Sequence, residues 1–225
     1  WAGPLRVRPS FHAAGDGATA DYSPRPNQPC RGGGAERIGR QVERWSKQYR
    51  ASETQRIEAM DNLIDWLPKN IPPEAGTSVV HGDFRLDNTV FHPNEPRMLA
   101  VLDWELSTLG HPLADFAYHC MGFHIPPDKF RGVGGLPLSE LGIPSEEEYL
   151  KAYLRRTRRA AVDRAIWDFY LAYNLFRIAA ICQGIAKRVL DGTAASQHAQ
   201  EAASKTVPLA ELGWQQAEKI LRRAA

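Results

Sequence analysis

The sequence predicts an α+β fold in which helices surround a small strand-rich centre. Apolar residues recur every three to four positions in the first and last thirds of the chain, which is the period of an amphipathic helix. Short apolar runs bounded by turn residues occupy residues 77–102, as is typical of strands. The most unusual polar residues of the chain fall at the ends of those strands, so the centre of the fold is the expected site of function.

The composition is that of an ordinary globular protein. The 225 residues carry 28 Lys and Arg against 26 Asp and Glu, and the formal charge of +2 gives no reason to expect nucleic-acid binding. Polar residues interrupt the apolar stretches before the ~20 residues of a membrane span are reached. The 3 cysteines are far apart and odd in number, so no disulfide framework is indicated. Together these features predict a cytoplasmic protein without a membrane or nucleic-acid partner.

The first part of the chain is predicted to divide into an arm and two helices. Residues 1–35 form an irregular arm, because glycine and proline are concentrated there and no apolar period survives. Helical periodicity begins at Glu36, where we expect the main unit, residues 36–225, to start. Ser52 and Gln55 have the spacing of a capping box and predict the start of a second helix.

The middle of the chain is predicted to hold three short strands and one helix. The strands are expected at Thr77–Val80, Thr89–His92 and Met98–Leu102. The last two are joined by a four-residue turn, Pro93-Asn94-Glu95-Pro96, which predicts a hairpin. A helix should follow over residues 112–121, and the glycine- and proline-rich segment 122–144 should form a loop.

The last third of the chain is predicted to be helical. Ser145 and Glu148 form a capping-box pattern that begins a helix reaching about Arg156. Longer helical periodicity extends over residues 163–190, and a final amphipathic helix extends over residues 208–223. The small polar residues between these two helices, 191–204, are expected to form a loop.

Three polar residues near the strands suggest phosphoryl-transfer chemistry. The first strand leads into a loop that holds Asp83 and Asn88, and the third strand ends at Asp103. Because a short turn joins the second and third strands, Asn88 and Asp103 should lie side by side. An amide oxygen and a carboxylate are hard ligands that suit Mg²⁺. Asp83 would then stand nearby, placed to orient and deprotonate a hydroxyl group during in-line transfer.

The same residues carry a resemblance to a known family. The spacing His-x-Asp-x-x-x-x-Asn at residues 81–88 is that of the protein-kinase catalytic loop. The fuller pattern, His-Gly-Asp-Phe-Arg-Leu-Asp-Asn, then Asp-Trp-Glu and Gly-His-Pro-Leu-Ala-Asp at 110–115, resembles the aminoglycoside phosphotransferase and choline kinase-like family. Residues 104–112 and 174–184 are closer still to the kinase-like domain associated with acyl-CoA dehydrogenases. The resemblance covers about residues 40–225.

The resemblance implies a fold, a reaction and roles for individual residues. Residues 36–225 should form the C-terminal, catalytic lobe of a protein-kinase-like fold, mostly helical with a small catalytic β-hairpin. Asp83 should be the catalytic base, and Asn88 and Asp103 the metal ligands. His81 should be a structural residue of the loop, and Asp115 a buried carboxylate that accepts hydrogen bonds from the loop backbone. The implied cofactors are Mg²⁺ and ATP, and the implied acceptor is a hydroxyl group of a small molecule.

The acceptor side of the site is expected in the long helix. Basic and aromatic residues are frequent between residues 155 and 190, which suits an anionic acceptor with an apolar arm better than a polycationic aminoglycoside. A hydroxyacyl-CoA, which the resemblance also suggests, fits that description. Arg177, Tyr173 and Asn174 are the candidate acceptor contacts. The alternative is that the arginines form a solvated helix face and that the aromatic residues belong to the core.

Other interpretations of the sequence stay open. A kinase-like enzyme needs a Gly-rich loop and a strand lysine ahead of its catalytic loop, and we expect this nucleotide-binding lobe to be missing here. The alternative function is therefore a truncated or degenerate kinase lobe that acts only as a binding or interaction module. A third candidate function is metal-dependent hydrolysis by the same carboxylates. The spacings of His111, His119, Cys120 and His124 match no common zinc site.

Overall fold

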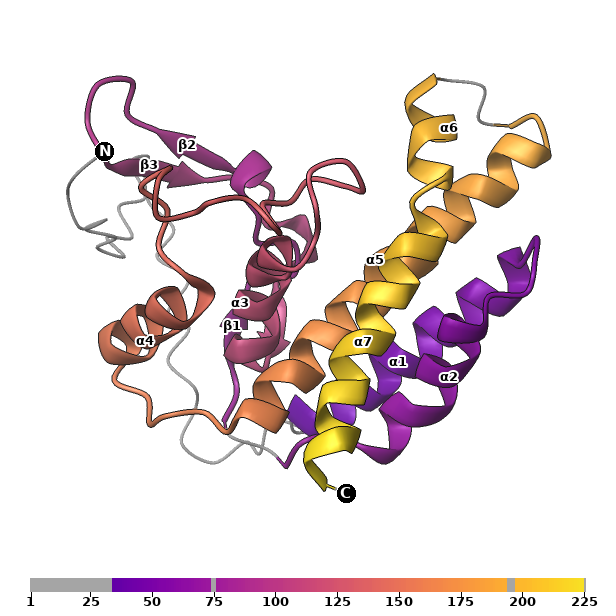
Figure 1. Ribbon diagram of the computed structural model, residues 1–225, viewed down its shortest axis with the longest axis horizontal. Helices are drawn as coiled ribbons and strands as arrows, with labels where there is room; N and C mark the ends of the chain where they lie inside the picture. The colour runs from indigo at the N-terminus through magenta and orange to yellow at the C-terminus, as the bar shows by residue number, and fades with distance from the viewer. Residues whose placement is uncertain (1–33, 74–75, 194–196, 225) are drawn as a thin grey trace, which may run out of the picture.

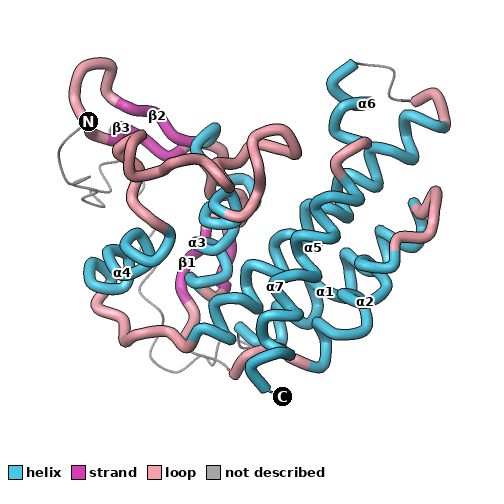
Figure 2. The backbone as a smooth tube through the Cα atoms, viewed as in Figure 1, coloured by secondary structure: helices cyan, strands magenta, loops and turns pink. Residues whose placement is uncertain are grey.

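The computed structural model describes residues 34–73, 76–193 and 197–224. Most of the predicted arm, residues 1–33 with Cys30, lies outside the described residues. Within them, helices gather around one long central helix, and two small sheets lie on the other side of the molecule (Figures 1 and 2). The predicted α+β class, mostly helical with a small hairpin region, is confirmed.

The helical part is built around α5 (Arg164–Leu190), which contacts α1 (Gly34–Ser52), α3 (Pro112–Cys120) and α7 (Thr206–Ala224). The shorter α2 (Glu58–Trp66) packs mainly on α7. α5 is long and apolar enough to meet the length and composition criteria of a membrane-spanning helix. Its apolar composition reflects its central place, where apolar and aromatic side chains surround it. Since 72% of its most apolar window is buried inside the protein, α5 is the core helix of this fold.

Two antiparallel strand pairs lie beside the helices. β2 (Thr89–Phe91) and β3 (Met98–Val101) form the predicted hairpin, with Thr89 opposite Val101. β1 (Ser78–Val80) pairs with β4 (Thr108–Gly110), a strand that the sequence analysis did not find. β4 is only three residues long, and it is a strand because β1, distant in sequence, supplies its hydrogen bonds.

The segment after α3 is mostly loop, as predicted, and then α4 (Glu146–Thr157) begins at a complete capping box. The backbone N–H of Ser145 donates to Glu148 at 2.9 Å, and the N–H of Glu148 donates back to the Ser145 hydroxyl at 3.3 Å. Each bond satisfies a backbone N–H at the start of the helix that would otherwise lack a partner.

The capping box predicted at Ser52 and Gln55 is wrong. Ser52 is the last residue of α1, and its hydroxyl donates to the carbonyl of Gln48 at 2.8 Å instead of capping the next helix. α2 begins later, after Ile57, which makes no side-chain cap hydrogen bond. A serine hydroxyl can bond backward or forward along the chain, so the four-residue pattern alone does not fix the direction.

The loop predicted over residues 191–204 is also partly wrong. It contains α6 (Gln197–Ala203), which packs against α5. Such a short helix is unstable in isolation, so packing against another helix decides whether it forms. The final helix also starts two residues earlier than predicted, at Thr206, with Pro208 in its first turn, where a missing backbone N–H costs nothing.

A buried carboxylate ties α5 to the end of α7. Asp168 is fully buried, and its two oxygens contact Arg164 at 3.0 Å and Arg223 at 2.7 Å. Both arginines are 45% exposed, so the ion pair spans from the core to the surface. Removing either arginine would leave the buried Asp168 carboxylate with one cationic partner fewer, and an incompletely paired buried charge destabilises the fold.

We therefore expect Arg223→Met to destabilise the fold by about 1.5–3 kcal/mol, the range for hydrogen bonds to charged groups. The neighbouring Arg222→Met is the matched control, because Arg222 pairs with the exposed Glu218 and such surface pairs contribute about 1 kcal/mol or less. Urea unfolding of both variants measures the difference. Equal losses in the two variants would contradict a special role for Asp168.

Candidate active site

The loop after β1 is fixed by the carboxylate of Asp115, in the first turn of α3. One oxygen of Asp115 accepts the backbone N–H of His81 at 2.8 Å, and the other accepts the N–H of Gly82 at 2.8 Å. The hydrogen bonds expected of Asp115 are therefore present, although its side chain is half-buried, not buried. A carboxylate in the first turn of a helix is also favoured by the helix dipole.

His81 joins the loop to the end of β3. Its ring is 3% exposed, and its Nδ1 accepts the backbone N–H of Asp83 at 3.2 Å. The hydrogen must then sit on Nε2, which donates to the carbonyl of Leu102 at 2.7 Å. The ring also lies against Trp104, with 4.7 Å between centroids. These contacts are those of a structural residue of the loop.

The carboxylate of Asp83 is held by two neighbours. The amide nitrogen of Asn88 donates to Oδ2 of Asp83 at 3.0 Å and to its carbonyl at 2.8 Å. Nε of Arg85 donates to the same Oδ2 at 3.1 Å. Because the nitrogen of Asn88 is used inside the loop, its amide oxygen is the atom left for a cation. The side chain of Asp83 is 17% exposed and so remains accessible.

Asp103 follows β3 at an open edge of the site. The backbone N–H of Leu102 donates to the carbonyl of Asn88 at 2.8 Å, so the two strand ends lie side by side, as predicted. Asp103 is exposed and has φ 64° and ψ 55°, a left-handed conformation that is uncommon outside glycine. Within the described ranges no hydrogen bond or ion pair engages its carboxylate.

These ligands fit Mg²⁺ better than zinc. Within residues 34–73, 76–193 and 197–224 no three His, Cys, Asp or Glu side chains gather as a metal site. Mg²⁺ does not need such a cluster, because in phosphoryl-transfer sites one or two carboxylates and the substrate phosphates bind it. The amide oxygen of Asn88 and the carboxylate of Asp103 are suitable hard donors for that arrangement.

The three candidate acceptor contacts lie inside the fold. Arg177 donates to the carbonyl of Gly82 at 2.7 Å, and its guanidinium lies 4.9 Å from the ring centre of Tyr118. Asn174 is 1% exposed and donates to the carbonyl of Ala114 at 2.8 Å. Tyr173 is 5% exposed, and burial raises the pKa of its phenol. Their positions do not support acceptor binding, because the helix face predicted to be a binding wall is packed core.

Tyr118 is a site residue that sequence reasoning missed. Burial raises the pKa of its phenol well above the usual value, and the adjacent Asp83, by its charge and as a hydrogen-bond partner, raises it further. Tyr118 therefore stays a neutral phenol beside the carboxylate. The only sequence signal was its position one helical turn after Asp115, which places both residues on the same face of α3.

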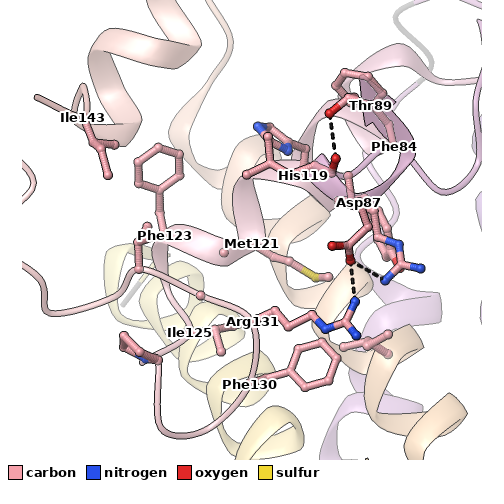
Figure 3. A pocket seen from close by; sticks show the side chains of 18 of the residues that line it. Phe84, Asp87, Thr89, His119, Met121, Phe123, Ile125, Phe130, Arg131 and Ile143 are labelled. Carbon is pink, nitrogen blue, oxygen red and sulfur yellow. Dashed lines mark hydrogen bonds and ion pairs between the residues drawn. The ribbon is translucent and has the colours of Figure 1, made fainter. Parts of the chain in front are cut away.

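A large cavity of about 1150 Å³ opens beside the loop (Figure 3). Phe84, Arg85 and Tyr118 form part of its wall, and Arg85 in turn bonds the Asp83 carboxylate, which lies outside the lining. At its rim Asp87 accepts from Arg85 at 3.1 Å and is also bonded by Arg131 from the 122–144 loop. The sequence held no local signal for Arg131, because Arg131 and Asp87 are 44 positions apart and only folding brings them together.

The family to which the chain belongs follows from comparison with known proteins. Residues 18–170 match the model of the phosphotransferase enzyme family. The chain belongs to this family. The match starts inside the segment predicted to be a separate arm and ends within α5. The division of the chain at residue 36 stays a prediction.

Relatives of this phosphotransferase-family chain include parts of much longer proteins. It is 49% identical over 184 residues to mouse acyl-CoA dehydrogenase family member 10, and 44% identical over 187 residues to mouse acyl-CoA dehydrogenase family member 11. Each match covers 81% of this chain but only 17% and 24% of those relatives. The predicted resemblance to the kinase-like domain of these proteins is confirmed.

A solved structure from Ralstonia eutropha, described as an aminoglycoside phosphotransferase, has the same fold. It superposes with a TM-score of 0.76 at 59% sequence identity. The alignment covers 81% of this chain and 55% of that one, so this phosphotransferase-family chain spans about half the length of its solved relative. The kinase-like fold is therefore shown.

The position of Gly82 leads to a first prediction for the site. Gly82 has φ 86°, and a Cβ there would lie 2.6 Å from the carbonyl oxygen of Leu106. Gly135 has a similar φ of 80° but open space around it. We expect Gly135→Ala to cost about 1 kcal/mol through backbone strain, and Gly82→Ala at least about twice as much because it also clashes. Urea unfolding compares them, and equal costs would contradict the clash.

The half-buried His119 predicts a dependence of stability on pH. Burial lowers its pKa from 6.5 to about 4, so the unfolded chain binds a proton more readily than the folded one. The folded state should therefore be most stable above pH 6.5 and lose up to about 3 kcal/mol as the pH falls toward 4. Unfolding measured across this range should show a shallower dependence in His119→Leu. An identical slope in both proteins would contradict the assignment.

Proposed function

We propose that this domain transfers the γ-phosphoryl group of ATP to a hydroxyl group of a small molecule, with Asp83 as the base. The observation that carries the proposal is the setting of Asp83. Its carboxylate is held by Asn88 and Arg85, on a loop that Asp115 clamps, beside the exposed Asp103. Phosphoryl transfer needs a positioned base next to hard metal ligands and little further covalent chemistry from the protein.

In the proposed mechanism each group of the chain has a separate task. Asn88 and Asp103 would hold Mg²⁺, which when bound with ATP offsets the negative charge of the phosphates. Asp83 would accept a hydrogen bond from the acceptor hydroxyl and then take its proton as the new O–P bond forms and the bond from the γ-phosphorus to the departing ADP breaks. Asn88 and Arg85 fix the direction of the Asp83 carboxylate, and His81 holds the loop against the end of β3. Positioning of this kind lowers the barrier because reacting groups are aligned beforehand.

The acceptor is proposed to be anionic with an apolar arm. Two relatives are named as acyl-CoA dehydrogenase family members, and a hydroxyacyl-CoA is an acceptor that could share a pathway with such a partner domain. The chain itself offers a rim with two arginines, Arg85 and Arg131, close to the proposed base. A hydroxyacyl-CoA would supply the hydroxyl on its acyl arm and the negative charge on the phosphates of its CoA.

A second function is favoured by a different observation. Large apolar side chains are exposed at the ends of the catalytic strands, among them Val79 at 58%, Leu102 at 50% and Leu106 at 53%. An exposed apolar group of this kind marks a surface that another protein segment covers. The alternative is therefore that this chain is a binding or interaction module that depends on a partner lobe. Hydrolysis by the same carboxylates remains a weaker third candidate.

Replacing the proposed base tests the leading function. We expect Asp83→Asn to reduce phosphoryl transfer from ATP to a hydroxyacyl-CoA at least about hundredfold, the usual contribution of general-base catalysis. Phosphorylated product is measured by mass spectrometry. Asp65→Asn, on the exposed face of α2, is the matched control and should keep full activity. Retained turnover in folded Asp83→Asn would contradict the role of Asp83.

Calorimetric titration of Mg·ATP separates the leading function from the interaction module. Binding that Asp103→Ala abolishes supports a formed metal site in this chain. A folded chain that binds neither Mg²⁺ nor nucleotide supports the interaction module instead. Release of phosphate from a phosphate ester without any nucleotide would point to hydrolysis.

A further inference from the structure

The cavity beside the catalytic loop has no role in the chemistry derived so far. Its volume, about 1150 Å³, is large enough for a drug-sized molecule. Its walls come from the catalytic loop, the β2–β3 hairpin, the end of α3, the 122–144 loop, α5 and α6. Figure 3 shows side chains from several of these elements turned toward a common space. A space assembled from so many elements adjoins the loop that carries Asp83.

The 122–144 loop forms one wall of this cavity, and backbone hydrogen bonds within the loop hold that wall in place. The backbone N–H of Val133 donates to the carbonyl of Gly122 at 2.8 Å, and that of Gly134 donates to the carbonyl of Ile125 at 2.9 Å. The two parts of the loop are so close that a Cβ at Gly132 would lie 1.9 Å from the carbonyl oxygen of Ile125. The cavity is therefore preformed on this side and does not need a ligand to shape it.

The inner surface of the cavity is largely apolar. Aromatic and aliphatic side chains from four segments line it, among them Phe84, Met121, Phe123, Ile125, Phe130 and Ile143. Two titratable groups of the lining, His119 and Tyr149, are uncharged near neutral pH. Burial lowers the pKa of His119 to about 4 and raises the pKa of Tyr149 to about 12. They lie 3.2 Å apart and hydrogen-bond with each other.

The charged residues of the lining do not favour a polycation. Three acidic side chains are matched by three basic ones: Asp87, Asp128 and Glu201, and Arg85, Arg131 and Lys205. Asp87 is bonded by both arginines, so its charge is already satisfied. An aminoglycoside carries several ammonium groups, and its recognition would need unpaired carboxylates on the wall.

We propose that this cavity binds the aliphatic arm of the hydroxyl acceptor, with the hydroxyl-bearing end directed toward Asp83. The inference rests on the proposed function for the identity of the acceptor, while the cavity itself rests on the geometry. The arm displaces water from the apolar wall, and the hydroxyl-bearing end lies at the rim, where Arg85 bonds both Asp83 and Asp87. Residues of the 122–144 loop then determine which acceptor is used, because they decide how long an arm fits.

Binding of simple fatty acids tests this inference without any turnover. Hexanoate, octanoate and decanoate are titrated calorimetrically into the full chain without nucleotide. Each added methylene should tighten binding about fourfold, since burying one CH₂ has that effect on transfer from water. Affinity that does not change with chain length, or no binding to the folded chain, would overturn the proposal.

Two variants that fill the cavity sharpen the test. Ile143→Trp adds bulk from the 122–144 loop, and Ala202→Phe adds it from α6. Each should weaken decanoate binding at least tenfold while affecting hexanoate less. Leu190→Trp is the matched control, because Leu190 is 70% exposed at the end of α5 and lies outside the lining. Equal weakening in the control and in a folded filling variant would contradict the cavity as the binding site.

The failure of this inference is distinguishable from failure of the proposed function. Asp83→Asn should still bind decanoate as the wild-type chain does, because the apolar wall is unchanged. Length-dependent binding in a chain that transfers no phosphate would retain the cavity and reject the reaction. Phosphoryl transfer that does not depend on acceptor chain length would retain the reaction and reject the cavity.

Discussion

The two hydrogen bonds to the Asp115 carboxylate are the constraint on which the candidate active site depends. They hold the backbone of His81 and Gly82, and bonds to a charged acceptor are among the strongest available. With the backbone fixed, the His81 ring reaches the carbonyl of Leu102, and Arg177 reaches that of Gly82. The loop is thus anchored to α3, β3 and α5 at once, and Asp83 takes its direction from that anchoring.

The surroundings of Asp83 and of Asp103 differ in how many contacts the chain itself provides. The side with Asp83 is closed, since its carboxylate is bonded by Asn88 and Arg85, and Arg85 also lines the apolar cavity. The side with Asp103 is open, since Asp103 is exposed and stands among exposed apolar side chains. This chain spans 55% of its solved relative.

Much of the fold and of the catalytic loop could be predicted because the signals are local. The hairpin follows from two apolar runs and a turn, and the start of α4 follows from the Ser145–Glu148 capping box. The loop that holds Asp83 and Asn88 follows from the motif at residues 81–88. The failures share a cause. Ser52 can bond in either direction along the chain, and β4 has no signal without the distant strand β1.

The sequence by itself determined the family, the helical class and the order of the candidate catalytic residues, because short stretches of the chain carry each of these signals. Only the tertiary structure decided which polar residues face one another. In the folded chain Tyr173 and Asn174 are buried in the core, and Tyr118 lies beside Asp83. Arg131 bonds Asp87 at the rim of a cavity. These contacts depend on how α3, α5 and the 122–144 loop pack against one another. Packing between segments that are distant in the chain leaves no periodic pattern or residue spacing in the sequence, so it could not be predicted.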